Sequence, residues 1–365
     1  MRLLNLRLLC LMLVALLSAI PCPGQQREIR KLFPVEKDGK WGFIDSTGKV
    51  VIPLEFDSAN EFHEGLALVT TGKQKALIDT SGRIVFKPQF DLVNNFSEGL
   101  AAVNIGQTRI ANLGLIGNPG RWGYIDKTGK LAIPPRFTHA EDFSEGLAAV
   151  TEGDRSGFID HKSKIVFEVP LDVTLGFHGG VVGVLFKGDV KYFDRSGKKI
   201  SPPIDYGPKS YSFSEGLVPV ASKGKWGFMD KTGKLVIAAQ FEDAENFSEG
   251  LAPVKIGGEI VWCPADETGD RAGYTMRYGF IDKTGKLVIP ARFESAAPFS
   301  EGLAAIHQCD QSFFIDKTGK TVIAENYKYA SSFAGGLAHV SILRNETLLD
   351  GYIDKTGKIV WGPTK

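Results

Sequence analysis

Acidic side chains recur along this 365-residue chain at spacings that could serve catalysis or metal binding. Nine aspartates end similar short runs, and successive members lie 34, 47, 34, 34, 36, 52, 34 and 38 residues apart. Asp126, Asp230 and Asp282 each precede Lys-Thr-Gly-Lys. That order predicts a type I turn with a glycine bulge, in which the aspartate accepts hydrogen bonds from turn amides. Catalysis needs a few convergent groups rather than one acid in every repeat, so we interpret these aspartates as turn residues.

The fourth of these turns differs from the others. It runs Asp160-His161-Lys162-Ser163-Lys164, with serine at the glycine position. Glycine adopts the left-handed backbone conformation without a clash at Cβ, whereas serine does not. We therefore expect a strained or altered turn at Ser163.

A second column of acids lies in a recurring Phe-Ser-Glu-Gly pattern. Its members are Glu64, Glu98, Glu145, Glu215, Glu249 and Glu301. Six aligned carboxylates could bind cations, whereas local capping or pairing with lysines would use them structurally. We favour the structural role, and we expect the following glycine to meet a backbone requirement.

Recognised catalytic spacings are absent from the sequence. It has no Gly-x-Ser-x-Gly, no His-Glu-x-x-His and no zinc-type cysteine pairing, and the glycine-rich segment 114–120 fits no nucleotide-binding pattern. The six histidines are scattered: His63, His139, His161, His178, His307 and His339. We predict a protein that is not an enzyme, with no catalytic residue, no metal site and no cofactor. A hydrolase assembled from distant repeats is the remote alternative, because such sites are geometric.

The elements that would position these residues are repeated strands. The run 41–45 is echoed at 122–126, 226–230, 278–282 and 350–354, and more weakly in runs that end at Asp79, Asp160, Asp194 and Asp316. Each is the second strand of a meander, preceded by a strand like 66–69 and followed by one like 50–52. The base period is 34 residues, and nine such three-stranded repeats span residues 32–361. Residues 25–31 form a linker and residues 362–365 a tail.

Two apolar patterns indicate how the repeats pack. Between repeats, Phe56, Ala59 and Phe62 illustrate an apolar residue at every third position, which predicts a tight helical or 3₁₀-like turn over the sheet. Adjacent columns of the second strand are both apolar, which predicts that both faces of this strand are covered. The Trp41, Trp122 and Trp226 column also holds polar residues, so we expect it to be partly exposed.

These residues resemble the WG-repeat (KWG-repeat) family, whose consensus is similar to residues 225–237 followed by the Phe-Ser-Glu-Gly turn. The resemblance covers residues 32–361, although Trp-Gly itself stands only at 41–42, 122–123 and 226–227. It implies an all-β repeat structure and a partner-binding role. We expect an open, solenoid-like array rather than the alternative, a β-propeller. Propeller blades usually have four strands and number four to eight, and no repeat here is divided between the two termini.

Three insertions interrupt the period, at 104–121, 255–277 and 341–349, always in the hairpin between the first and second strands. Equivalent loops of a regular array project from one edge, which favours a protein-binding surface there, while neutral loop growth is the other interpretation. Candidate contact residues are Arg109, Asn118, Trp262 and Arg344. A glycan or cell-wall ligand contacting Trp41, Trp122 and Trp226 is the alternative function.

Two cysteines fall in this same hairpin of successive repeats. Cys263 lies in the second insertion and Cys309 in the hairpin of the next repeat. Stacked neighbours would bring the two together, so we predict a disulfide between them.

The N-terminus resembles a secretory signal. Arg2 and Arg7 precede an uncharged 13-residue run, 8–20, which suits a signal peptide of residues 1–24 and a secreted or periplasmic protein. Lipoprotein anchoring at Cys22 is a minor alternative, because Ile20 and Pro21 make a poor lipobox. No later run is long enough to span a membrane. The 43 basic and 42 acidic residues leave no global field for nucleic acid, so we predict a protein partner or a glycan and no nucleic acid.

Overall fold

The structure is a computed structural model that describes residues 31–109, 116–174, 176–200, 213–263, 273–345 and 347–364. The chain divides into two compact units, Met1–Arg30 and Lys31–Lys365, and every described residue belongs to the second. The expected signal peptide, with Arg2, Arg7 and Cys22, therefore lies outside the described residues. The described residues form strands and turns without a helix, so they contain no helix that could cross a membrane.

The strands form nine small antiparallel sheets, numbered here sheet 1 to sheet 9 in chain order. The first strands of the meanders are β1 (Phe33–Lys37), β5 (Leu66–Thr71), β9 (Leu100–Arg109), β13 (Leu147–Glu152), β17 (Val181–Phe186), β20 (Leu217–Ser222), β24 (Leu251–Trp262), β28 (Ala304–Gln308) and β32 (Leu337–Arg344). The second strands are β2 (Lys40–Ile44), β6 (Gln74–Asp79), β10 (Ile116–Asp126), β14 (Arg155–Asp160), β18 (Asp189–Asp194), β21 (Lys225–Asp230), β25 (Gly273–Asp282), β29 (Gln311–Ile315) and β33 (Thr347–Asp354). The third strands are β3 (Val50–Phe56), β7 (Ile84–Phe86), β11 (Leu131–Phe137), β15 (Ile165–Glu168), β19 (Lys199–Ile200), β22 (Leu235–Phe241), β26 (Leu287–Phe293), β30 (Thr321–Tyr327) and β34 (Ile359–Thr364). The predicted meander is thus confirmed in every repeat.

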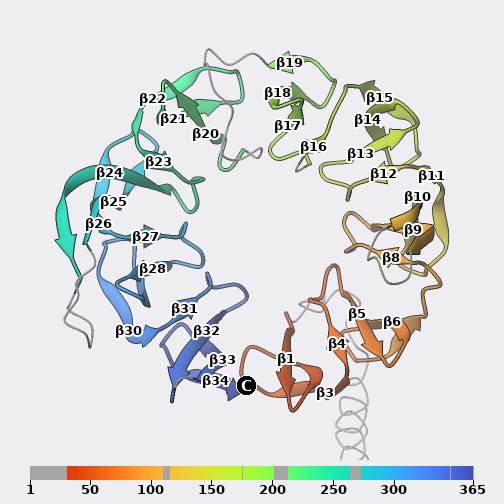
Figure 1. The fold of residues 1–365 in the computed structure, drawn as a ribbon, viewed down its shortest axis with the longest axis horizontal. Coiled ribbons are helices and arrows are strands. Elements are labelled where there is room, and N and C mark those ends of the chain that lie inside the picture. The colour runs from red at the N-terminus through yellow and green to blue at the C-terminus, as the bar shows by residue number, and fades with distance from the viewer. Residues whose placement is uncertain are drawn as a thin grey trace, which may run out of the picture. The chain divides into compact units, whose positions relative to one another are not determined.

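Seven sheets carry a fourth, two-residue strand that precedes the meander. These inner strands are β4 (Ser58–Ala59), β8 (Leu92–Val93), β12 (His139–Ala140), β16 (Val173–Thr174), β23 (Asp243–Ala244), β27 (Ser295–Ala296) and β31 (Tyr329–Ala330). In sheets 1 and 6 the preceding segments, 1–30 and 201–212, fall outside the described residues. The inner strands lie on the central side of the sheets (Figure 1).

The inner strands correct the expected 3₁₀-like turn. The segment that contains Phe56, Ala59 and Phe62 is extended at Ser58–Ala59, and the amides of Asp57 and Asn60 donate to the carbonyls of Thr70 and Leu68. These acceptors belong to the first strand of the following meander, so the spacing of three reflects a short strand between two bends. The sequence of this segment alone does not reveal the pairing, because the strand has only two residues and its partner lies in the next meander.

Nine hydrophobic clusters of described residues join the sheets in sequence. Eight of them link sheet 1 to sheet 2, and so on up to sheet 9. The ninth contains Phe33, Val35 and Ile44 of sheet 1 together with Leu337, Tyr352 and Trp361 of sheet 9. Every sheet therefore packs against two neighbours, and the sheets close into a ring (Figure 1).

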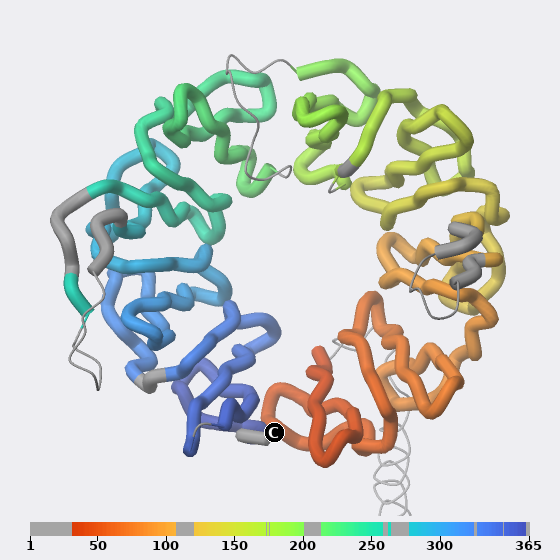
Figure 2. Tube along the Cα trace, in the orientation of Figure 1, coloured from red at the N-terminus to blue at the C-terminus, as the bar shows by residue number. Residues whose placement is uncertain are grey.

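This closure makes the described unit a nine-bladed β-propeller and corrects the expected open array. The fourth strand, which the sequence pattern did not reveal, gives most sheets the usual composition of a propeller blade. Among the described residues, no strand is exchanged at the seam between sheet 9 and sheet 1, as the undivided repeats indicated. Side chains close it instead: the rings of Phe33 and Tyr352 lie 5.6 Å apart, and the Tyr352 hydroxyl donates to the Pro34 carbonyl over 3.3 Å. The C-terminal strand lies beside sheet 1 (Figure 2).

The antiparallel order gives the ring two different faces. All hairpins between first and second strands lie at one end of the sheets, which we call the hairpin face. The turns after the inner strands and those between second and third strands lie at the opposite end, the turn face. The acidic columns belong to the turn face and the three insertions to the hairpin face.

The Trp-Gly pair has a local backbone cause. Trp41 pairs with Phe56 and Phe43 with Ile52, so β3 contains a bulge opposite Gly42. A Cβ at Gly42 would lie 2.6 Å from the carbonyl oxygen of Ile52, and Gly123 is restricted in the same way by Ile133. Close backbone approach therefore demands glycine at this position.

Candidate functional site

The nine aspartates of the turn face are structural. In each case Oδ1 accepts hydrogen bonds from the amides two and four residues later, as Asp230 does from Thr232 and Lys234 at 2.9 and 3.1 Å. The Thr232 hydroxyl also donates to it over 2.6 Å. This hydroxyl bond holds the pKa of Asp230 below its ordinary value, against the opposing effect of burial, and the turn amides add to it. The predicted turn is confirmed.

The fourth turn keeps the same backbone hydrogen bonds despite its serine. The amide of Ser163 donates to the carbonyl of Asp160 over 2.9 Å, and Ser163 adopts φ of 63°. The expected strain is therefore present in the left-handed conformation of a residue with a Cβ, and the turn geometry is unchanged.

The six glutamates of the turn face connect neighbouring sheets. Glu249 of sheet 7 accepts from the amide of Gly302 in sheet 8 at 3.1 Å, and Lys317 of sheet 8 lies 3.0 Å from its carboxylate. The amide contact recurs from Glu64 to Gly99, Glu98 to Gly146, Glu145 to Gly180, Glu215 to Gly250 and Glu301 to Gly336. Glu64, Glu215 and Glu301 also pair with a lysine, and Glu98 lies near His161. Capping and pairing with lysines are thus the observed roles, across the sheet interface rather than locally.

The lowered pKa of Glu249 and one further hydrogen bond support this interface. Burial alone would raise the pKa of Glu249, but the Lys317 ammonium and the Gly302 amide outweigh it and the pKa lies below its ordinary value. The serine of the same motif also reaches the next sheet: Ser248 Oγ donates to the Phe299 carbonyl over 2.6 Å. The Phe-Ser-Glu-Gly motif therefore joins blades and does not form a site.

The three tryptophans of the alternative, glycan-binding function lie on separate sheets. Trp41, Trp122 and Trp226 lie on sheets 1, 3 and 6 and are half-buried against three different hydrophobic clusters. The aromatic column beside them is core, since Phe43, Tyr124 and Phe158 are fully buried. The three tryptophans therefore do not form a single ligand-binding surface.

The hairpin face presents apolar side chains to solvent where the insertions lie. The hairpins β9–β10, β24–β25 and β32–β33 belong to sheets 3, 7 and 9. Trp262 and Leu343 are each 56 % exposed, and Leu348, which pairs with Leu343 across the last hairpin, is 42 % exposed. Arg344 is also exposed. Arg109 and Asn118 lie on β9 and β10, but their side chains fall outside what the structure describes, as do residues 110–115, 264–272 and 346 of the insertions.

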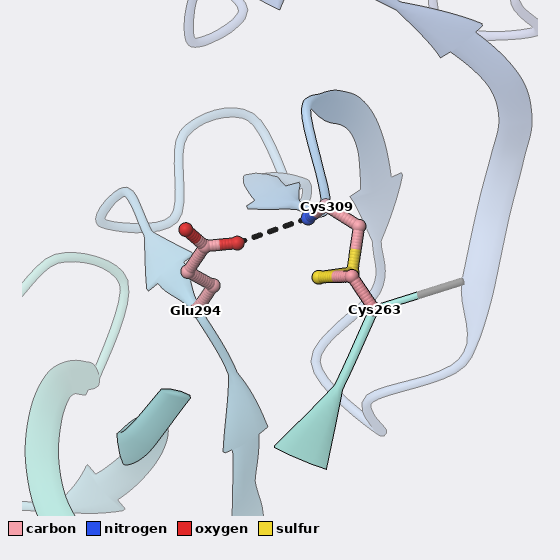
Figure 3. A group of neighbouring side chains, drawn as sticks. All are labelled: Cys263, Glu294 and Cys309. Carbon is pink, nitrogen blue, oxygen red and sulfur yellow. Dashed lines mark hydrogen bonds between the residues drawn. A yellow bond between two sulfur atoms is a disulfide. The ribbon is translucent and has the colours of Figure 1, made fainter. Parts of the chain in front are cut away.

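A disulfide anchors the longest of these hairpins to the next blade. Cys263 directly follows β24, Cys309 lies in the hairpin of sheet 8, and their sulfurs are bonded with the Cα atoms 5.4 Å apart. Glu294 approaches from the end of β26 and accepts from the Cys309 amide at 2.9 Å (Figure 3). The neighbouring Trp262 is thereby held at the edge of the ring.

Cys263, Glu294 and Cys309 are also the one grouping of metal-ligand type among the described residues. Metal ions bind the thiolate form of cysteine. While the two sulfurs are bonded to each other, they do not offer thiolate ligands, so the arrangement in Figure 3 is that of a structural cross-link.

A pocket of about 270 Å³ opens at the seam between sheet 9 and sheet 1. Its wall includes the aromatic residues Trp41, Tyr352 and Trp361 and the carboxylates of Glu36 and Asp350. Burial, with a contribution from the nearby Glu61 carboxylate, raises the pKa of Tyr352 to about 12. Sequence analysis missed this site. Its one visible signal is Asp350, which stands in the tryptophan column of the ninth repeat.

The polar residues in and beside the pocket are not ordered as a serine–histidine–acid relay. The Ser341 hydroxyl donates to Asp350 over 2.5 Å, and His339 Nε2 lies 3.7 Å from the same carboxylate oxygen. In a serine–histidine–acid triad the histidine stands between the hydroxyl and the acid. Here the acid stands between the other two.

Comparison with solved structures finds a likeness in fold. Among curated proteins, none matches the sequence. The chain resembles a solved structure described as a eukaryotic initiation factor, with 13 % identity, a TM-score of 0.55, and coverage of 90 % of this chain and 95 % of that one. It also resembles the C-terminal WD40 domain of Sif2, with 10 % identity, a TM-score of 0.39, and coverage of 86 % and 95 %. At such identities the first likeness concerns the fold alone.

The family model described as "WG containing repeat" matches six segments: 41–73, 77–108, 122–155, 226–259, 278–308 and 313–342. Together they make up more than half of the chain. Each segment begins in the second strand of one sheet and runs into the first strand of the next sheet, so it crosses a blade interface. The chain belongs to the family of WG-containing repeat proteins.

Proposed function

We propose that this chain is a secreted, non-enzymatic binding scaffold that contacts a protein partner through the hairpin face. The observation that carries the proposal is the exposure of large apolar side chains on the long hairpins. Trp262, Leu343 and Leu348 present apolar surface at the ends of β24–β25 and β32–β33. Exposed tryptophan and leucine side chains on a rigid scaffold are suited to anchor a partner.

The turn face supports the choice of the hairpin face, because its recurring acids already have structural roles. The acids of the turn face are engaged in turns and interblade contacts, as Asp230 and Glu249 are, so the recurring carboxylates serve the ring. The disulfide favours an oxidising compartment, which suits an extracytoplasmic location behind a signal peptide of residues 1–24.

The proposal is tested by placing a photo-crosslinking amino acid at position 262 or 343 of the full chain. The control position is Val236, which is 45 % exposed on an outer strand away from the hairpin face. We expect one protein from an envelope fraction to be cross-linked from positions 262 and 343 and not from 236. The double variant Trp262→Ser and Leu343→Ser, labelled at 348, should lose it. Equal labelling from 236, or none from the hairpins, would overturn the proposal.

Glycan binding remains the second candidate, supported by the pocket beside Trp41. Trp122 and Trp226 lie on other sheets, so this function would need separate sites on separate blades. Sugar-induced protection of tryptophan fluorescence from acrylamide, lost in Trp41→Leu, would favour it.

A further inference from the structure

The seam pocket occupies a place that tryptophan fills at other blade interfaces. Trp41 packs between sheets 1 and 2, Trp122 between sheets 3 and 4, and Trp226 between sheets 6 and 7. The equivalent residue of sheet 9 is Asp350, which faces sheet 1. The shorter side chain leaves space between the blades, and it replaces an apolar ring by a carboxylate.

The chemistry of the wall is aromatic and negatively charged. Trp41, Tyr352 and Trp361 supply rings and Glu36 and Asp350 supply carboxylates. The wall contains no lysine or arginine; its one basic side chain is His339, whose Nε2 lies 3.7 Å from the Asp350 carboxylate and is charged only when protonated. A cation gains from the electron-rich faces of aromatic rings and from opposite charges in a partly desolvated site. We infer that the pocket binds an alkylammonium group, namely a lysine side chain of the protein partner; its assignment to a partner rests on the proposed function.

The position of the pocket suits a peptide that also contacts the last hairpin. Asp350 and Leu348 are two residues apart on β33 and thus share one face of sheet 9, and Leu348 pairs with Leu343. Two residues of strand span roughly 7 Å. A partner segment could place an apolar residue on Leu343 and Leu348 while its lysine enters the pocket.

A second pocket among the described residues provides an internal comparison. It has a volume of about 100 Å³ and is lined by Phe137, Glu152, Arg155 and Glu168, among others. Arg155 contacts the Glu168 carboxylate, so a guanidinium that is always charged already pairs with the acid there. Its wall also has one aromatic ring instead of three, so we expect it not to take a cation.

The test is a titration of the intact protein at pH 8 with the peptide acetyl-Gly-Lys-Gly-amide, followed by NMR. The matched peptide with Nε-acetyl-lysine keeps the aliphatic stem and removes the charge. We expect the lysine peptide to bind with a Kd on the order of 1 mM and the acetylated one at least about tenfold more weakly.

Two variants of one residue locate the site. Asp350→Asn keeps an acceptor for Ser341 and should weaken binding about tenfold, while Asp350→Trp restores the tryptophan of other repeats and should abolish it. Glu168→Gln, in the second pocket, should bind as wild type does. If Asp350→Trp does not fold, the binding measured for Asp350→Asn alone tests the inference.

Three results would overturn the inference: equal binding of both peptides, no binding by either, or no effect of Asp350→Asn. N-acetylglucosamine is titrated in parallel, because the indole N–H of Trp361 is buried without a partner in the described structure and would suit a hydroxyl. Binding of the sugar in preference to the lysine peptide would assign the pocket to glycans instead.

The two proposals can fail separately. If the hairpin positions cross-link no protein while the lysine peptide still binds, the proposed function is rejected and the cation preference of the pocket is retained.

Discussion

At the scale of single residues, the repeated motifs are explained by backbone requirements. The aspartate of each turn accepts two or more turn hydrogen bonds, and the glycine of Trp-Gly lies against the carbonyl of a bulged strand. The turn role of the aspartates could be predicted from sequence because all donors lie within four residues. The partners of Glu249 could not, because Gly302 and Lys317 belong to the next blade and are 53 and 68 residues away.

The carboxylates of the turn face predict how stability depends on pH. The pKa values of Asp230, Asp282 and Glu249 lie below their ordinary values. A lowered pKa in the folded state contributes stability that is fully present above the unfolded-state value and is lost as pH falls through the folded-state value. We therefore expect the melting temperature to be flat near neutrality and to fall below about pH 4.5.

A triple variant tests whether the turn aspartates cause this dependence of stability on pH. The triple change Asp230→Asn, Asp282→Asn and Asp316→Asn should lower the melting temperature at pH 7, and the difference from wild type should narrow as the pH falls and the wild-type groups become protonated. Scanning calorimetry across this range is the measurement. A constant difference at all pH values would contradict the role given to the charged form.

The strained turn at Ser163 predicts a stabilising substitution. Ser163→Gly should raise the free energy of unfolding by about 1 kcal/mol, because glycine adopts the left-handed conformation without the Cβ clash. The exposed contact of Arg136 with the serine hydroxyl is lost, at little cost. The reverse change, Gly129→Ser, should destabilise, since a Cβ there would lie 2.7 Å from the Phe86 ring. Urea unfolding checks both, and a less stable Ser163→Gly protein would contradict the strain.

At the scale of elements, the turn face holds contacts between blades, and the hairpin face holds the long hairpins with exposed apolar side chains. Meander strands such as β5 and β6 could be predicted from sequence because their partners follow directly across a short hairpin. The two-residue strand β4 could not be, since its pairing depends on the position of the following sheet. The insertions were visible as departures from the period, and the structure adds that Trp262, Leu343 and Leu348 are exposed on them.

Loss of the disulfide should lower the local stability of one hairpin more than the stability of the whole protein. Non-reducing mass spectrometry should recover the linked peptides that contain Cys263 and Cys309, and two free thiols would contradict the pairing. The double variant Cys263→Ser and Cys309→Ser should exchange amide hydrogens faster in segment 251–262, while the melting temperature changes little. The reason is that the bond holds a hairpin extension outside the main core. Segment 337–344, on the uncross-linked last hairpin, is the internal control.

At the scale of the whole molecule, the ring depends on nine similar interfaces. The all-β repeat organisation could be predicted from the period, but closure could not. It results from the rotation between successive sheets, which is set by side-chain packing at interfaces such as that of Phe280, Phe299 and Ile315. The seam pocket was invisible for the same reason, because Trp41 and Asp350 are neighbours only once the ring is closed.

Closure predicts that the chain tolerates circular permutation. Joining residue 364 to residue 31 through a short Gly-Ser linker, and opening the chain between Lys87 and Pro88, should give a folded protein that melts within a few degrees of the wild type. The reason is that sheets 9 and 1 already lie in contact. Far-ultraviolet circular dichroism with a thermal scan is the measurement. A permutant that folds only after the linker is lengthened several-fold would contradict the direct contact of the two end sheets.

Among the described residues, the glutamate column makes contacts at six of the nine blade interfaces, and all of them point the same way around the ring, from one sheet to the next. The blades thus behave like subunits of a cyclic assembly with head-to-tail interfaces, fused into one polypeptide. Head-to-tail interfaces either close on themselves or continue into filaments. Closing after the ninth blade leaves neither a free head nor a free tail. A molecule whose seam has opened would present both, and it would be able to add to another opened molecule through the same contacts that normally complete its own ring.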